Sequence, residues 1–110
     1  MQDVNEVVSA ALEGLSCPAT RTPAHGADEY VTWSLVGVQP AVYASDRVRR
    51  AVYMVQVDVY SRGHYAALLN DVMQHMFAAG FYLRETASED YEEDTGYHHV
   101  PITYLWAAQI

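Results

Sequence analysis

A chain of 110 residues has the size of one ordinary domain, so residues 1–110 are expected to form a single unit. Its formal net charge of −8 argues against a surface that binds phosphate groups, and its single cysteine excludes an internal disulfide. The sequence shows no secretory leader and no apolar stretch long enough for a membrane span, which favours a protein made in the cytoplasm.

Residues 3–15 carry apolar side chains at the spacing of an amphipathic helix. The apolar positions are Val4, Val7, Val8, Ala11, Leu12 and Leu15. Asp3 and Glu6 stand three residues apart at its start, the spacing of a capping box in which Asp replaces Ser or Thr. Residues 16–27 contain Pro18, Pro23 and Gly26, and they are expected to form a loop that leads to a sheet.

Residues 29–38 and 49–60 alternate between the two faces of a strand. The apolar faces consist of Val31, Trp33 and Leu35 in the first strand and of Ala51, Tyr53, Val55, Val57 and Val59 in the second. Pro40 is expected to end the first strand, and residues 40–47, which include Tyr43 and Asp46, to connect the two. The length of the second strand predicts a central place in the sheet.

Helical spacing returns over residues 64–79, and Gly80 is placed as a C-terminal cap. The apolar side of this helix consists of Tyr65, Leu68, Leu69, Val72, Met73, Met76 and Phe77. Residues 81–86 predict a short strand, and an acidic loop follows. The last strand is expected over residues 97–107, with Val100, Ile102, Tyr104 and Trp106 on one face.

The order helix, strand, strand, helix, strand, strand predicts an α+β fold built from two αββ units. Connections of this kind favour a mainly antiparallel four-stranded sheet with both helices packed on one face. The core is expected to contain Val31, Trp33, Leu35, Val55, Val57, Leu69, Val72, Met76 and Ile102.

The motifs of common catalytic, phosphate-binding and metal sites are absent from the sequence. His98 and His99 are adjacent, so in a strand they point to opposite faces and do not readily chelate one ion. The acidic stretch lacks the pattern of a calcium-binding EF-hand loop. No catalytic residue, cofactor site or metal site is therefore predicted. Because two αββ units resemble small regulatory modules in outline, a small-molecule-binding regulatory domain is the alternative.

The composition favours assembly with other protein subunits. Only 18% of the residues are charged while nine are tyrosines, and tyrosine is enriched at protein interfaces. The excess negative charge gathers in one acidic stretch, and three arginines form the only basic cluster. If the acidic stretch lies away from the main contact surface, or faces the arginines of a neighbouring copy, the nearly neutral remainder of the domain can associate. In the second case the contact would join the copies head to tail. The predicted interface consists of Arg47, Arg49, Arg50, Glu89, Asp90, Glu92, Glu93 and Asp94.

A running pattern covers residues 30–105: V-Y-A-S-D at 42–46, V-Q-V-D-V-Y-S-R-G at 55–63, A-A-G-F at 78–81 and D-Y-E-E-D-T-G-Y-H-H at 90–99. In this pattern the chain resembles the small tail-completion or tail-terminator proteins of long-tailed bacteriophages and prophages. The resemblance implies a small α+β subunit without catalytic or cofactor residues.

The same resemblance implies a homo-oligomeric ring, expected to be a hexamer, that caps the finished tail tube and contributes to the joint with the head. The implied partners are the tail-tube protein and the head–tail connector proteins. DNA would pass through such a ring without specific nucleic-acid binding, and no membrane is involved. The implied location is the tail of the virion, after assembly in the host cytoplasm.

Overall fold

The structure is a computed structural model that describes residues 3–24, 26–45 and 47–109. Asp46, which belongs to the predicted connection, lies outside the described residues. The described residues form two helices and a six-stranded sheet. In chain order the elements are α1 (Val4–Leu12), β1 (Ala19–Thr20), β2 (Glu29–Ala44), β3 (Arg47–Ser61), α2 (Ala66–Ala78), β4 (Tyr82–Thr86), β5 (Asp90–Glu92) and β6 (Tyr97–Gln109).

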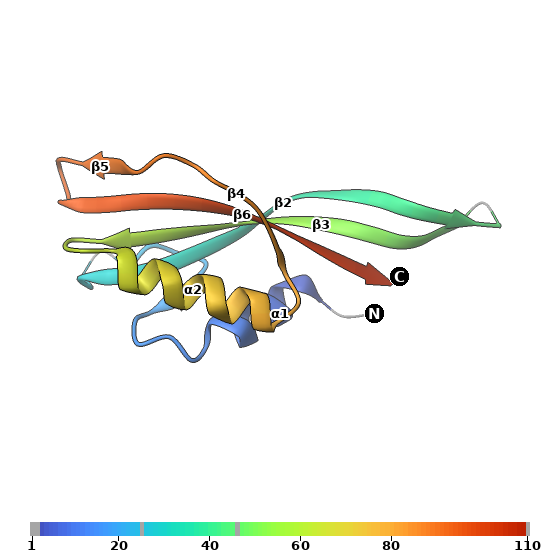
Figure 1. Ribbon diagram of the computed structural model, residues 1–110, viewed down its shortest axis with the longest axis horizontal. Coiled ribbons are helices and arrows are strands. Elements are labelled where there is room, and N and C mark those ends of the chain that lie inside the picture. The colour runs from blue at the N-terminus through green and yellow to red at the C-terminus, as the bar shows by residue number, and fades with distance from the viewer. Residues whose placement is uncertain (1–2, 25, 46, 110) are drawn as a thin grey trace.

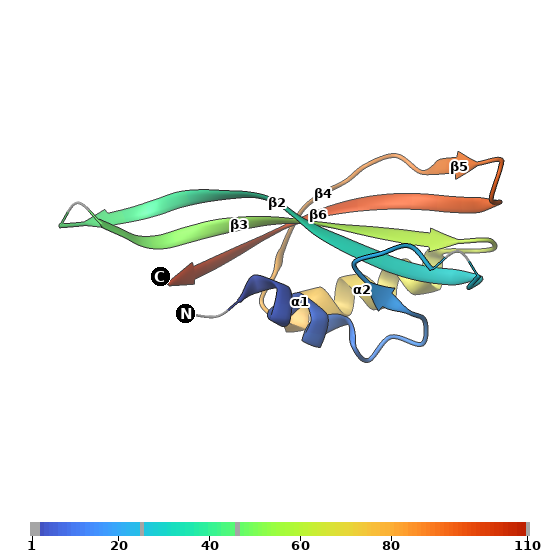
Figure 2. The same ribbon diagram turned by 180° about the vertical axis from the view of Figure 1, so that it is seen from behind.

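The sheet has the strand order β1-β2-β3-β6-β4, and β5 also pairs with β6. All pairs are antiparallel except β1 with β2. Both helices lie on one side of the sheet, α2 towards the viewer in Figure 1 and α1 towards the viewer in Figure 2. The α+β class and the mainly antiparallel sheet are therefore confirmed. The predicted count of four strands is wrong, since the sheet has six. The two strands that were not predicted, β1 and β5, have only two and three residues, which is too short for an alternating pattern to be visible in the sequence.

The helix ends follow local chemistry. The carboxylate of Asp3 caps α1 by accepting a hydrogen bond of 2.9 Å from the backbone N–H of Asn5. After α2, Gly80 has a φ of +91°, and the N–H of Phe81 donates to the carbonyl of Met76, so Gly80 ends the helix as predicted. Among the residues described, no helix has the length and apolarity that a membrane span requires.

The β2–β3 hairpin extends beyond the helices as an arm, here defined as residues 39–52, and gives the molecule extents of 52 × 25 × 21 Å (Figure 1). The expectation that Pro40 ends the first strand is wrong, since β2 continues to Ala44 and Pro40 pairs with Ala51. At this position β2 is an edge strand and an irregularity in the register follows, and both features accommodate a residue without an N–H.

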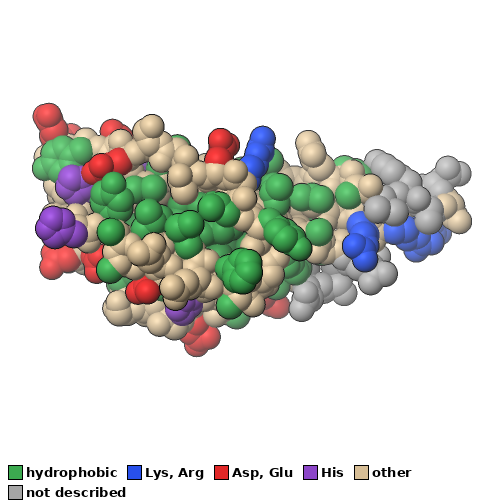
Figure 3. Space-filling model, viewed as in Figure 1, with side chains coloured by type: hydrophobic (Ala, Val, Ile, Leu, Met, Phe, Trp, Pro, Cys, Tyr) green, Lys and Arg blue, Asp and Glu red, His purple; other side chains and the backbone are tan. Residues whose placement is uncertain are grey.

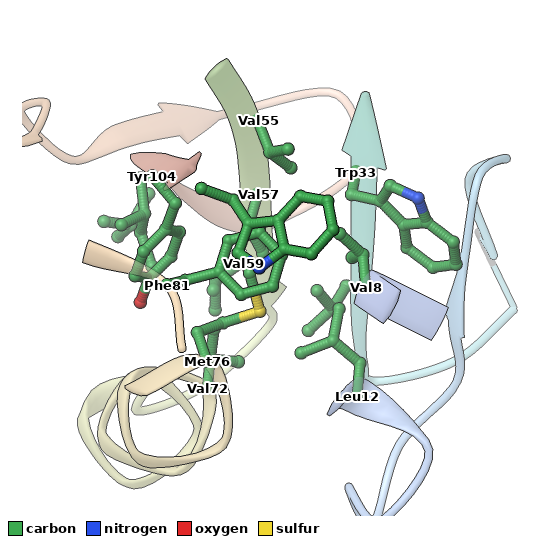
Figure 4. Close-up of a cluster of buried hydrophobic side chains, with 14 of the residues drawn as sticks. Val8, Leu12, Trp33, Val55, Val57, Val59, Val72, Met76, Phe81 and Tyr104 are labelled. Carbon is green, nitrogen blue, oxygen red and sulfur yellow. The ribbon is translucent and has the colours of Figure 1, made fainter. Parts of the chain in front are cut away.

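The core lies between the two helices and the near face of β2, β3 and β6 (Figure 4). The predicted core residues Val31, Trp33, Val55, Val57, Val72, Met76 and Ile102 are buried, and Leu69 packs against them partly buried. Leu35 was also expected there, but it is 36% exposed. Leu35 lies on the same face of β2 as Val31 and Trp33, but at the edge of the sheet. Val36 and Val38 are exposed there as well, so the core ends before the arm begins.

Candidate subunit interface

The three predicted interface arginines lie at the start of β3, on the arm. Arg47, Arg49 and Arg50 are all exposed. The β2–β3 ladder places Arg47 opposite Ala44 and Arg50 opposite Val42, close to the turn of the hairpin. Figure 3 shows arginine side chains on the arm at the right of the molecule. The arginines therefore form a basic end that is free to meet another molecule.

The acidic residues lie at the other end of the long axis, around the β5–β6 hairpin. Glu89, Asp90, Glu93 and Asp94 are exposed, and Glu92 is half-buried. Gly96 closes the turn with a φ of +78°, and its N–H donates to the carbonyl of Glu92 over 2.8 Å. Several acidic and histidine side chains gather at this end in Figure 3.

Two of these carboxylates are engaged within the chain. Glu89 accepts a hydrogen bond from the hydroxyl of Tyr65 over 3.2 Å and also contacts Nδ1 of His98. The hydrogen bond to Glu89 raises the pKa of the Tyr65 hydroxyl, because it favours the protonated donor. Glu92 accepts a bond of 3.0 Å from the hydroxyl of Thr95. These contacts fix the shape of the acidic end and leave Asp90, Glu93 and Asp94 pointing to solvent.

The basic and acidic ends do not meet within one molecule. The ladder between β3 and β6 runs from Arg50 opposite Gln109 to Ser61 opposite His98. At about 3.3 Å per residue this ladder is roughly 36 Å long. An ion pair between the two groups therefore requires two copies, as the predicted head-to-tail contact supposes.

The face of the sheet opposite the helices carries a polar network that the sequence pattern does not reveal. Asp58 is 9% exposed and accepts hydrogen bonds from Nε2 of His99 over 2.8 Å and from Nε2 of Gln56 over 3.0 Å. The spacing of Gln56 and Asp58 puts them on one face, but the partnership with His99 depends on the β3–β6 register. The pairing also confirms that His98 and His99 point to opposite faces.

This network continues into a stack of aromatic rings. The ring of Tyr60 lies 4.4 Å from the rings of both Tyr30 and His99, nearly parallel to each. Burial, and next the charge of Asp58, raise the pKa of Tyr60 to about 12. A histidine held by a carboxylate can act as a base in enzymes, but no described hydrogen bond joins this pair to a hydroxyl or thiol nucleophile. Its contacts are those of a structural network.

Two grooves flank α2. One lies between α1 and α2 and is lined by Val7, Ala11, His75 and Ala79 among others; there Nδ1 of His75 lies 2.8 Å from the carbonyl of Ala11. The other lies between α2 and β4 and has a volume of about 340 Å³. Its lining residues are Asn70, Met73, Gln74, Phe77, Phe81, Leu83 and Tyr104. It is the more apolar of the two.

The groove between α2 and β4 contains an unsatisfied polar atom. Tyr104 is 2% exposed, and its hydroxyl has no hydrogen-bond partner within the described part of the chain. Figure 4 shows this hydroxyl beside Phe81, outside the cluster of aliphatic side chains. Burial raises the pKa of Tyr104 to about 12. A buried hydroxyl without a partner destabilises the folded state by about 1–3 kcal/mol.

The raised pKa values predict a loss of stability in alkali. Tyr60 and Tyr104 have folded pKa values of about 12 against an ordinary value of 10, so their neutral forms stabilise the fold below pH 10 and this stabilisation is lost as the pH rises to 12. In Tyr104→Phe, urea unfolding should show a shallower alkaline loss of stability and no loss at neutral pH. Tyr82→Phe, at a 70% exposed position, is the control. An unchanged alkaline profile in Tyr104→Phe would contradict this assignment.

No group of three or more histidine, cysteine, aspartate or glutamate side chains that could hold a metal ion occurs among residues 3–24, 26–45 and 47–109. The single cysteine, Cys17, is half-buried, and burial raises the pKa of its thiol, which lowers its reactivity.

No family model and no curated protein matches the chain. Its fold is similar to that of a chain in the virion of the native gene transfer agent particle. The two chains have a TM-score of 0.58 and 14% sequence identity, over 94% of this chain and 85% of that chain. At this identity the likeness shows a shared fold over nearly the whole length of both chains.

Proposed function

We propose that this chain is a structural subunit of a phage or prophage tail, which forms a ring that caps the tail tube and joins it to the head. The observation that carries the proposal is the shared fold, over 94% of the chain, with a component of a virion. The residue patterns that resemble tail-completion and tail-terminator proteins supply the finer assignment. Virion localisation and partnership with tail-tube and connector proteins are part of this proposal.

The shape and charge of the subunit fit a joint between two different structures. A basic arm and an acidic end lie at opposite ends of a molecule 52 Å long. In a ring whose subunits all point the same way, each rim would present one of these ends. One rim would then meet the tail tube and the other the head, with different charges available for each contact.

Deletion of the gene in the phage or prophage that encodes this chain is the test of the proposed function. The expected result is DNA-filled heads and tails that stay apart or have uncapped ends in electron micrographs, together with a loss of infectious particles. A plasmid copy of the gene should restore joined particles. Normal yields of infectious particles from the deletion would overturn the proposal.

The arginines of the arm are expected to matter for completion and not for folding. Because Arg49 and Arg50 are exposed, Arg49→Glu with Arg50→Glu should leave the thermal unfolding of the subunit nearly unchanged. The same double variant should restore joined particles poorly in the deletion background, since it reverses the charge of one end. Asp71→Arg, which reverses a charge at an exposed position of α2 away from the arm and from both sheet edges, is the control. Full complementation by the double variant would count against a role for the arm charges.

The proposal includes the absence of catalytic activity. The rival function, binding of a small regulatory molecule, makes an opposite prediction, because a ligand of the folded state raises the melting temperature by mass action. A panel of common metabolites and divalent metals is expected to leave the melting temperature unchanged. A clear shift with one compound would favour the regulatory domain.

A further inference from the structure

One row of side chains crosses the sheet from edge to edge. Leu35 on β2 pairs with Val55, Val55 pairs with Tyr104, and Tyr104 pairs with Leu83 on β4. The two inner members are buried, whereas Leu35 is 36% and Leu83 46% exposed at the ends of the row. All four residues face the helix side of the sheet, so each edge presents an apolar side chain at the same level and on the same face.

Both edges are open at this level within the described residues. The parallel partner β1 covers β2 only at Val31 and Thr32, so β2 has an unpaired side from Trp33 onward. On the opposite edge, β4 pairs with β6 alone. Pro40 has no N–H and limits further pairing of β2 to the stretch before it, which is about as long as the five residues of β4.

The apolar groove lies directly beside the β4 edge. Phe77, which is 80% exposed, and Leu83 form its sides, and the unpartnered hydroxyl of Tyr104 lies in its lining. Figure 3 shows hydrophobic side chains gathered along the middle of this face of the molecule. The other edge exposes Leu35, and next to it Val36 and Val38, on β2. Each edge thus has an apolar surface that the other could cover.

We infer that the β2 edge of one copy joins the β4 edge of the next copy, so that the sheet continues from subunit to subunit and Leu35 and Val38 cover the groove beside Phe77 and Leu83. This inference rests on the proposed ring and specifies its contact. Since β2 and β4 run in opposite directions within the sheet, the new pair is antiparallel and neighbouring copies point the same way. A contact between two different edges can repeat around an axis, and it closes a ring when the rotations between successive copies complete a full circle.

Because this contact is small, we expect that stable assembly requires a closed ring. Stable interfaces bury about 800 Å² on each partner, and a joint of five or six residues with a few apolar side chains is smaller. Two copies should therefore associate weakly, while a closed ring gains one additional contact without further loss of translational freedom. An open edge that pairs only over a short stretch also limits uncontrolled aggregation.

Disulfide trapping tests the contact directly. In a chain with Cys17→Ser, the pair Leu35→Cys and Leu83→Cys places one cysteine on each edge, and opposite residues of an antiparallel pair are close enough for a disulfide. Mild oxidation at high protein concentration is expected to give a ladder of cross-linked oligomers that ends at one closed species. Each single-cysteine variant can give no more than dimers. A double-cysteine chain that yields no ladder overturns the inference.

A second cysteine pair separates this contact from the head-to-tail alternative. Arg49→Cys with Glu93→Cys joins the basic arm to the acidic end, and in the edge-to-edge ring it should give no ladder. If only this pair gives a ladder, the edge contact is rejected in favour of the head-to-tail contact, and the proposed ring still stands. Failure of both pairs would refute the edge contact, while the proposed function would still be judged separately by the deletion phenotype.

A substitution in the groove between α2 and β4 tests independently whether the groove takes part in the contact. Phe77→Asp places a charge where the neighbour's apolar edge is expected to lie, so sedimentation should show the midpoint of assembly moved to at least about tenfold higher concentration. The exposed position of Phe77 predicts an unchanged monomer fold by circular dichroism. Asp71→Asn, on the exposed side of the same helix, is the control. Assembly of Phe77→Asp at the parent concentration would exclude the groove from the contact.

Discussion

Replacing Phe81 with alanine is expected to lower the free energy of unfolding by about 3–5 kcal/mol, the usual cost of removing a buried aromatic ring. Phe81 follows the cap of α2 and is 2% exposed. Its ring packs edge-on against Tyr104 at 6.2 Å and nearly parallel to Trp106 at 5.9 Å. The truncation therefore opens a cavity beside Tyr104 and Trp106 of β6.

Phe77→Ala is a matched control for this prediction, because it removes the same ring four residues earlier. Phe77 is 80% exposed, so its loss should change the free energy of unfolding by no more than about 0.5 kcal/mol. Urea unfolding followed by tryptophan fluorescence and by circular dichroism measures both variants. Equal effects at the two positions would show that the end of α2 is packed differently.

Tyr97→Ala is expected to destabilise the fold by a similar amount, about 3–5 kcal/mol, although Tyr97 lies on the helix-free side of the sheet. The residue is fully buried, with its ring edge-on to Tyr30 at 5.1 Å and to Tyr60 at 6.0 Å. The guanidinium of Arg62 lies 4.5 Å from the ring centre. Its hydroxyl also donates a hydrogen bond to the carbonyl of Ala27, which connects the loop before β2 to the start of β6.

Two substitutions at this position separate the ring from the hydroxyl. Tyr97→Phe keeps the ring and should cost only about 0.5–1.5 kcal/mol, the net worth of one hydrogen bond. Urea denaturation gives both values, and limited proteolysis reports whether the loop before β2 opens first. Tyr82→Ala, at a 70% exposed position, should have little effect. A loss in Tyr97→Phe as large as in Tyr97→Ala would assign the stabilisation to the hydrogen bond.

The sequence predicted those elements in which one face is largely apolar, although Phe77 on the predicted apolar face of α2 is 80% exposed. Both helices, the long central strand β3 and the last strand β6 have unbroken apolar faces, and periodicity alone located them. Periodicity failed where the position of a residue in the folded sheet determines whether a strand forms or continues. Pro40 normally ends a strand, but on an edge its missing N–H is tolerated. β1 and β5 exist only because longer strands offer them a partner.

The surfaces were predictable to a smaller extent. The sequence identified the basic and acidic groups, and it could not place them at opposite ends, because that depends on how far the β2–β3 hairpin extends. Leu35 illustrates the same difficulty, since its alternation matches that of Val31 and Trp33 while the core ends before it. The pairing of Asp58 with His99 spans 41 residues and follows from the β3–β6 register.

The separation of the two charged ends has a consequence for how assembly responds to ionic strength. In the edge-to-edge ring, neighbouring copies point the same way, so arginine clusters lie beside arginine clusters and acidic ends beside acidic ends. These like charges repel, and the range of that repulsion falls from about 10 Å at 0.1 M salt to about 3 Å at 1 M. Added salt should therefore promote the edge-to-edge ring. It should weaken a head-to-tail contact of arginines with carboxylates, so the direction of the salt effect on assembly distinguishes the two arrangements.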